Sequence, residues 1–129
     1  MELIKGITAT KEITVTADKT AAAMGSGSLE VFATPAMIAL MEETAASSVA
    51  EALDEGCATV GTLVNVAHLS ATPVGATVRC ESVLTEVEGR KLSFSVKAYD
   101  GAGLIGEGTH ERFIIFSEKF MAKTRAKLN

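Results

Sequence analysis

Alternating apolar and polar positions mark the beginning of the chain as extended. Residues 6–16 alternate β-forming and polar side chains, with Ile7, Ile13 and Val15 as the apolar members. This period of two predicts a first strand. Residues 17–29 are small and polar, so we expect a loop there, with a short helical turn near 19–23.

The segment that begins at Thr34 predicts a long helix. Thr34 is a residue type favoured at the N-cap, and Pro35 suits the first helical position because its missing N–H has no partner there. We expect the helix to end near Glu55, since Gly56 is a typical stop signal. At about 100° per residue, one stripe gathers the mainly apolar positions: Met37, Ile38, Met41, Ala45, Ser48, Val49 and Ala52.

The remainder of the chain has the pattern of four strands. Residues 58–69 are apolar at both parities, 77–87 follow a turn at Thr72–Gly75, and 104–116 end the series. In the strand between them the inward positions are Leu92, Phe94, Val96 and Ala98. Ser117 is expected to cap a short basic helix. Strands joined by short turns predict an antiparallel sheet with one long helix packed on it, an α+β fold.

Composition narrows the class of protein. The length of 129 residues fits a single domain over 1–129, and with 5% aromatic residues and no tryptophan the core must be aliphatic. A net charge of −4 argues against a nucleic-acid partner. Apolar runs are too short to span a membrane, so we expect a cytoplasmic protein. Cys57 and Cys80 have neither zinc-site nor disulfide spacing, which favours two reduced, packed thiols and no metal site.

Two ionisable residues lie in unusually apolar surroundings. Glu42 falls at the edge of the apolar helix stripe, whereas Glu43 falls on the opposite, solvated side. His68 ends the strand at 58–69 and shares the parity of Val60, Val64 and Val66. Buried ionisable groups are costly unless compensated, and they gather at functional sites.

Thr34 precedes Glu42 by just over two helical turns, so both side chains can project toward one end of a pocket. A carboxylate beside a hydroxyl and an imidazole can attack a carbonyl or activate water to do so. The N–H groups at the helix start could stabilise an oxyanion. From spacing alone, three simpler roles stay open. Thr34 as a plain cap, Glu42 as a surface ion-pair partner and His68 as a hydrogen-bonded core residue fit the pattern as well.

Three segments carry a resemblance to a known family. These are the run VFATPAMIALME at 31–42, the stretch from Gly-Thr at 61–62 to HLSATPVG at 68–75, and GTHERF at 108–113. In order and spacing, nearly the whole chain resembles the hotdog-fold acyl-CoA thioesterases, most closely the branch that includes fluoroacetyl-CoA thioesterase. The resemblance implies a hotdog fold, a five-stranded antiparallel sheet wrapped around one long central helix.

The resemblance also implies an activity, the hydrolysis of a small acyl-CoA thioester to free acid and coenzyme A. The matching catalytic residues are Thr34, Glu42 and His68; Gly61 approaches the thioester, and Arg112 lies near the coenzyme A site. It implies a homodimer with the active site at the subunit interface, a tetramer also being compatible, and no metal or organic cofactor. His110, on the same strand face as Arg112, is expected to be structural or at the interface.

One departure from the resembled branch concerns the acyl pocket. That branch has aromatic residues before the helix that form a lid, whereas this chain has Met-Gly-Ser-Gly-Ser-Leu at 24–29. We therefore do not expect selectivity for fluoroacetyl groups, and the segment fits a mobile lid or a plain connection equally. A non-catalytic acyl-CoA-binding hotdog module is the alternative function. A hotdog dehydratase is a third and weaker possibility, because the histidine usual in the helix of such enzymes is absent.

Overall fold

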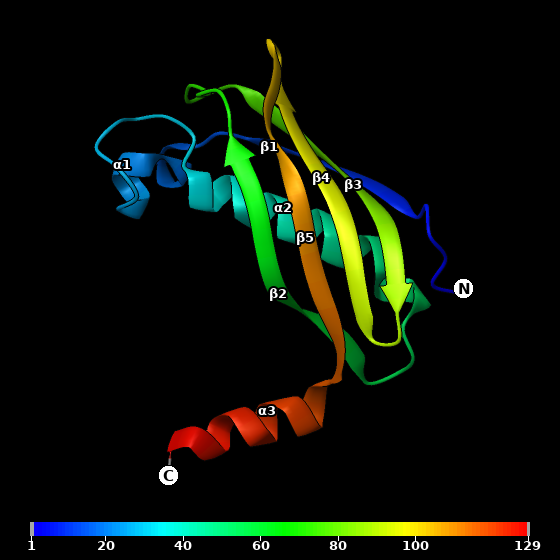
Figure 1. The fold of residues 1–129 in the computed structure, drawn as a ribbon. Helices are drawn as coiled ribbons and strands as arrows, with labels where there is room; N and C mark the ends of the chain where they lie inside the picture. The colour runs from blue at the N-terminus through cyan, green and yellow to red at the C-terminus, as the bar shows by residue number, and fades with distance from the viewer. Residues whose placement is uncertain (1, 129) are drawn as a thin grey trace.

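The computed structural model of the protein describes residues 2–128 and confirms five antiparallel strands with one long helix. In chain order the elements are β1 (Thr8–Thr14), α1 (Ala21–Met24), α2 (Thr34–Val49), β2 (Cys57–His68), β3 (Thr77–Glu88), β4 (Lys91–Asp100), β5 (Gly103–Phe116) and α3 (Ser117–Arg125). Single 3-10 turns occur at Ala17–Lys19, Ala50–Ala52 and Ala126–Leu128. The sheet curves around α2, which lies along its concave face, while α3 projects from the end of β5 (Figure 1).

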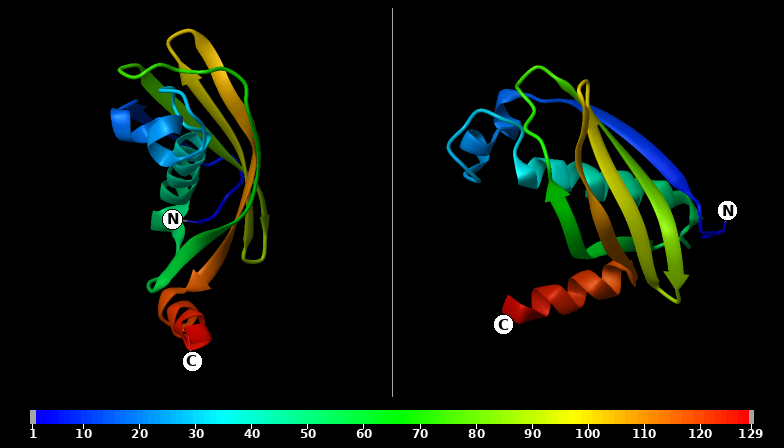
Figure 2. Two further views of the ribbon diagram at one scale, coloured as in Figure 1. Left: turned by 90° about the vertical axis from the view of Figure 1, so that its left-hand side faces the viewer. Right: turned by 45° about the horizontal axis from the view of Figure 1, so that its top comes forward.

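The order of strands across the sheet is β1-β3-β4-β5-β2, and every neighbouring pair is antiparallel. The turn expected at Thr72–Gly75 is present, but it does not join neighbouring strands. It belongs to a connection that carries the chain from β2, at one edge of the sheet, past β5 and β4 to β3 (Figure 2). β2 therefore pairs only with β5 among the described residues.

The predicted ends of α2 are wrong by one residue at the start and about six at the finish. Ala33 is the N-cap, with extended backbone and no side-chain cap, and Thr34 is the first helical residue. The helix ends at Val49 and a 3-10 turn follows. Gly56, expected to stop the helix, instead adopts a positive φ of 84° in the turn before β2. Thr34 is thus freed from capping and can bond elsewhere.

The start of α3 differs from expectation in the same way. Its N-cap is Phe116, and Ser117 is the first residue of the helix rather than its cap. No side-chain hydrogen bond caps this helix, and none of its residues is buried. The predicted basic helix therefore exists, with Lys123 and Arg125 in its last turn.

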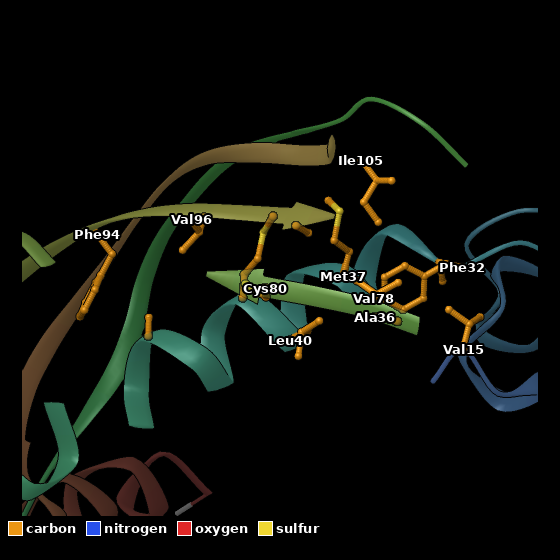
Figure 3. Packing of buried hydrophobic residues seen from close by; sticks show 14 of the residues in the cluster. Val15, Phe32, Ala36, Met37, Leu40, Val78, Cys80, Phe94, Val96 and Ile105 are labelled. Carbon is orange, nitrogen blue, oxygen red and sulfur yellow. The ribbon is translucent and has the colours of Figure 1, made fainter. Parts of the chain in front are cut away.

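The core fills the space between α2 and the concave face of the sheet (Figure 3). The four inward residues predicted in β4 are all buried. The curved sheet covers more of α2 than the predicted stripe, so Leu40 and Thr44 are buried too, while Ile38 and Ser48 are only half-buried. The buried residues of α2 are Ala36, Met37, Leu40, Met41, Thr44, Ala45 and Val49.

A β-bulge in β2 sets which of its side chains face α2. Gly61 pairs with Arg112 and Leu63 with Glu111, so Thr62 is the extra residue and the alternation shifts there. Beyond the bulge, Val64 pairs with His110 and His68 with Gly106. Because paired residues share a face, Gly61 and His68 lie on the same side as Arg112.

The bulge corrects the predicted parity of Val60. Val60 pairs with Phe113, whose side chain lies on the face opposite to that of Arg112. Val64 and Val66 do share the face of His68, as predicted, because all three follow the bulge.

Glycines in β5 allow α2 and β2 to approach this face closely. A Cβ on Gly106 would lie 2.5 Å from the sulfur of Met37 on α2. A Cβ on Gly108 would overlap the backbone of β2, at 2.6 Å from the Cα of Val66. Both glycines therefore make room for the elements that carry Thr34 and His68.

Candidate active site

Thr34 and His68 meet at the N-terminal end of α2. Thr34 is at the first helical position, His68 is the last residue of β2, and the Thr34 Oγ1 lies 2.7 Å from the His68 Nδ1. The bulge turns His68 toward the helix, and the cap at Ala33 leaves the threonine hydroxyl available. The structure thus brings together two of the three residues assigned to catalysis.

The second nitrogen of His68 is buried and has no hydrogen-bond partner among the described residues. Burial lowers the pKa of His68 below its ordinary 6.5, and the backbone of Ser70 acts in the opposite, weaker direction. The imidazole is therefore neutral at pH 7, with one nitrogen bonded to Thr34 and the other unengaged. A neutral imidazole in this state can accept a proton.

A hollow of about 290 Å³ opens beside the Thr34–His68 pair. Its walls come from α1 and the segments that flank α2 and β2, and are mostly small or apolar: Ala21, Ser26, Val31, Phe32, Leu69, Ser70 and Ala71, together with Thr34 and His68. A hollow of mixed polarity next to a hydroxyl and an imidazole is suited to a small organic group.

Glu42 occupies a second cluster farther along α2. Its Oε2 lies 3.4 Å from Nη1 of Arg112, and its side chain is 41% exposed. A Cβ on Gly61 would stand 2.5 Å from the same oxygen. Gly61 therefore lets the carboxylate lie directly against the β2 backbone, and Glu42, Gly61 and Arg112 form one group.

Arg112 is held by more partners than the carboxylate alone. Its Nε donates to the Thr59 Oγ1 at 2.8 Å and its Nη2 to the Thr59 carbonyl at 2.9 Å. Its Nη1 also lies 3.1 Å from Nε2 of His110. Burial lowers the pKa of Arg112, an effect that Glu42 opposes. The residue is only 7% exposed, so the guanidinium is a fixed cation.

Two members of this second cluster are not among the residues assigned to the site from sequence. The sequence signal that points to His110 is its position two residues before Arg112, which places both side chains on one face of the strand. Thr59 has no comparable signal, because a threonine in a strand is ordinary and its role depends on a partner 53 positions away.

The two clusters are separate within one chain. Eight residues along α2 correspond to about 12 Å, and the six residues of β5 from Gly106 to Arg112 to about 20 Å. Among residues 2–128, no hydrogen bond or ion pair joins Glu42 to Thr34 or His68. One chain therefore supplies a Thr34–His68 pair and, at a distance, a carboxylate–guanidinium pair.

Glu43, a second hollow and the two cysteines lie outside both clusters. Glu43 faces solvent, as predicted, and its carboxylate pairs with Lys11 at 3.6 Å. A hollow of about 310 Å³ between α1, α2 and β1 contains none of the five assigned residues. Both cysteines are free, and burial raises the pKa of Cys80, which keeps that thiol protonated.

The residues that the structure describes include no cluster of three His, Cys, Asp or Glu side chains placed to bind a metal. None of the helices within 2–128 is long and apolar enough to cross a membrane.

The Gly-Ser segment is folded back onto α1 by backbone hydrogen bonds. Gly25 ends α1 in the left-handed region with φ 73°, and the N–H of Ser26 bonds to the carbonyl of Ala21. The N–H of Ala22 bonds in turn to the carbonyl of Leu29. Because Ser26 lines the hollow beside His68, this segment forms part of the pocket rim.

Comparisons with known proteins agree on one relationship. Residues 15–118 match the family described as fluoroacetyl-CoA-specific thioesterase. A fluoroacetyl-CoA thioesterase of Streptantibioticus cattleyicolor is 49% identical over 98 residues, which cover 76% of this chain and 70% of that protein.

Solved structures confirm the hotdog fold. A fluoroacetyl-CoA thioesterase structure superposes with a TM-score of 0.93 at 40% identity, covering 98% of both chains. A variant of that enzyme was solved in complex with acetyl-CoA, and matches with the same TM-score over 98% of this chain and 100% of that one. A thioesterase superfamily member of Thermus thermophilus matches with a TM-score of 0.88 at 30% identity, covering 95% of this chain and 91% of that one.

Proposed function

The chain belongs to the family of fluoroacetyl-CoA-specific thioesterases, and we propose that it hydrolyses a small acyl-CoA thioester to the free acid and coenzyme A. The observation that carries this proposal is the presence of both a Thr34–His68 hydrogen bond and a Glu42 carboxylate held by Arg112 and Gly61. A non-catalytic acyl-CoA-binding module has no use for a buried, unengaged imidazole nitrogen next to a hydroxyl.

The working unit in this proposal is a homodimer. β2 is an edge strand, and its Leu63 and Val64 are 45% and 39% exposed, which is unusual for large apolar residues on a strand edge. Pairing two copies of β2 antiparallel about a twofold axis would cover this edge. It would also bring the His68 end of one β2 toward the partner's opposite end, the end nearer Gly61.

Such a dimer would join the two clusters into one site. The separation of about 12 Å along α2 prevents Glu42 and Thr34 of one chain from both contacting a single thioester carbon. Across the twofold axis, the Thr34–His68 pair of one subunit would instead face Glu42, Gly61 and Arg112 of its partner. Each dimer would then have two equivalent composite sites.

The chemistry follows from the state of each group. The Glu42 carboxylate attacks the thioester carbonyl or takes a proton from the water that does so. The Gly61 backbone polarises the carbonyl. As the carbon–sulfur bond breaks, the neutral His68, oriented by Thr34, passes a proton taken from water to the sulfur of coenzyme A, which leaves as the thiol. These side chains and water suffice, so we propose that no metal or organic cofactor takes part. Two free thiols, one of them buried, fit a reducing cytoplasm.

The acyl group in this proposal occupies the hollow beside Thr34 and His68. The rim segment from Met24 to Glu30 is exposed throughout and holds no aromatic side chain. The segment therefore has no aromatic lid over the acyl group. We therefore propose that the enzyme accepts several small acyl-CoAs without selectivity for the fluorinated one.

A thiol-release assay over a panel of acyl-CoAs, acetyl and fluoroacetyl among them, tests the activity. The result we expect is turnover of several short chains at similar kcat/KM. Binding of acyl-CoA without release of thiol would favour the non-catalytic module instead.

Mixing two inactive variants tests the composite site. Glu42→Gln and His68→Ala are each expected to be inactive as homodimers. If the clusters combine across subunits, a heterodimer of the two has one site with all residues intact. Random reassortment should then restore about a quarter of the wild-type activity. If each site came from one chain, mixing would restore none.

A further inference from the structure

His110 is a buried histidine whose two ring nitrogens are both engaged. It is 1% exposed, on the face of β5 that carries Arg112. Its Nδ1 lies 2.8 Å from the carbonyl oxygen of Leu63 and must therefore carry the proton. Its Nε2 lies 3.1 Å from Nη1 of Arg112, and a guanidinium can only donate, so Nε2 accepts. One neutral tautomer alone satisfies both contacts.

The acceptor at Nε2 decides where Arg112 points. Nε and Nη2 of Arg112 are committed to Thr59, which leaves Nη1 for the carboxylate of Glu42 at 3.4 Å. Nη1 is thus shared between His110 and Glu42. Removing the imidazole acceptor would leave the guanidinium anchored at one edge only and free to turn away from the carboxylate.

We propose that His110 is a positioning residue. As a neutral acceptor its imidazole directs Arg112 toward Glu42, and protonation of the imidazole breaks its contact with Arg112 and so frees the guanidinium from the carboxylate. This inference rests on the proposed catalytic use of Glu42. His110 does not itself touch the hollow where the acyl group is placed. It acts through Arg112.

The charged groups that face His110 come from two elements. Arg112 on β5 disfavours the imidazolium, and Glu42 on α2 favours it. From β2 the contact is the Leu63 carbonyl, and from β4 it is the ring of Phe94, at 6.2 Å between centroids, neither of which titrates. Burial is the largest influence and lowers the pKa of His110. The imidazole is therefore neutral near pH 7 and is protonated only in more acidic solution.

Two substitutions separate the contacts of His110. His110→Asn keeps a donor near the Nδ1 position but offers Arg112 no acceptor. His110→Gln places an amide oxygen near the Nε2 position and restores that acceptor. We expect His110→Asn to lower kcat by about ten- to a hundredfold, the loss for one hydrogen bond to a charged group. KM should change little, and His110→Gln should keep most of the activity.

A structural role alone would not produce that difference. Both variants must show the wild-type melting transition and circular dichroism. Equal kcat losses in the two folded variants, or no loss in His110→Asn, would overturn the proposal.

A measurement independent of turnover uses the two histidines of the chain. In nitrogen-15 spectra of His68→Ala, the remaining imidazole should show a protonated Nδ1 and an unprotonated Nε2. The carboxyl carbon resonance of Glu42 should then shift as His110 titrates, and this step should vanish in His110→Gln. A protonated Nε2, or a Glu42 resonance indifferent to the titration, would overturn the proposal. Failure to hydrolyse any acyl-CoA would defeat the proposed function, while these spectra would still decide the coupling.

Discussion

Glu42 and Gly61 lie so close that a Cβ atom on residue 61 would stand 2.5 Å from Oε2 of the glutamate. The same Cβ would lie 3.3 Å from Nη1 of Arg112 and 3.3 Å from Cε1 of His110. Gly61 has no positive φ, so its role is to leave space rather than to adopt an unusual backbone. The absence of a side chain at this position is what allows the carboxylate to reach the β2 backbone.

Gly61→Ala should therefore impair catalysis more than folding. The atom that its methyl would meet is the end of a half-exposed glutamate side chain, which can rotate away. We expect kcat to fall at least about tenfold and the melting temperature by no more than about 5 °C. Gly108→Ala is the matched comparison, because its methyl would meet the β2 backbone and should cost far more stability. Unchanged kcat in Gly61→Ala would contradict the placement of Glu42.

Glu42→Gln and Glu43→Gln form a second matched pair on adjacent residues. Glu42 contacts Arg112 in the candidate site, whereas Glu43 makes a solvated ion pair with Lys11. Loss of a general base or nucleophile should lower kcat about a hundredfold or more in Glu42→Gln. Glu43→Gln should be indistinguishable from wild type in a thiol-release assay. Full activity in Glu42→Gln would show that the carboxylate has no part in the chemistry.

Thr34→Val and Thr34→Ser test the hydrogen bond to His68. Valine keeps the volume and removes the hydroxyl that lies 2.7 Å from Nδ1, while serine keeps the hydroxyl. Because Thr34 is exposed and does not cap α2, neither change should alter stability much. We expect Thr34→Val to lower kcat about tenfold and Thr34→Ser to retain most of it. Similar kcat values for the two variants would mean that the hydroxyl is dispensable.

Stability should fall as the solution is made mildly acidic. Burial lowers the pKa of His68 and of His110 below the ordinary 6.5. Below pH 6.5 the unfolded chain therefore binds protons at these imidazoles that the folded chain does not yet bind. Proton binding stabilises the unfolded state relative to the folded state, so the free energy of unfolding falls until the folded-state pKa values are passed. Melting temperatures measured from pH 7.5 to 5 should decline, and less so in His110→Gln. The pKa values of Asp18 and Asp100 lie below 3.8, so these carboxyls titrate outside this window.

The sequence predicted those parts of the fold that depend on local pattern. The alternation in β4 and the Pro35 signal located a strand and a helix correctly, because burial follows periodicity there. The crossing between β2 and β3 was not predictable, since a short turn signal does not state which strands it joins. The ends of α2 also differ from the prediction, because residue type favours Thr34 as the N-cap whereas the backbone places Ala33 at that position.

The candidate site was predictable in its residues but not in its grouping. Thr34, Glu42 and His68 stood out by type and surroundings, and the family resemblance added Gly61 and Arg112. Their division into two clusters could not be foreseen, because Glu42 and Arg112 are 70 positions apart and a bulge resets the parity of β2. His110 was expected to be structural, and its contact with Arg112 depends on that same register.

Because Thr62 is an extra residue in β2, the number of positions between Gly61 and His68 decides whether the two residues share a face. Seven positions separate them, an odd number that would turn one of the pair outward in a regular strand. Deleting Thr62 would leave six positions, an even number that keeps both residues on the concave face of a strand without a bulge. When relatives are aligned, a gap of one in this stretch therefore marks a strand that has lost the bulge, with the histidine still on the sheet face that covers the helix.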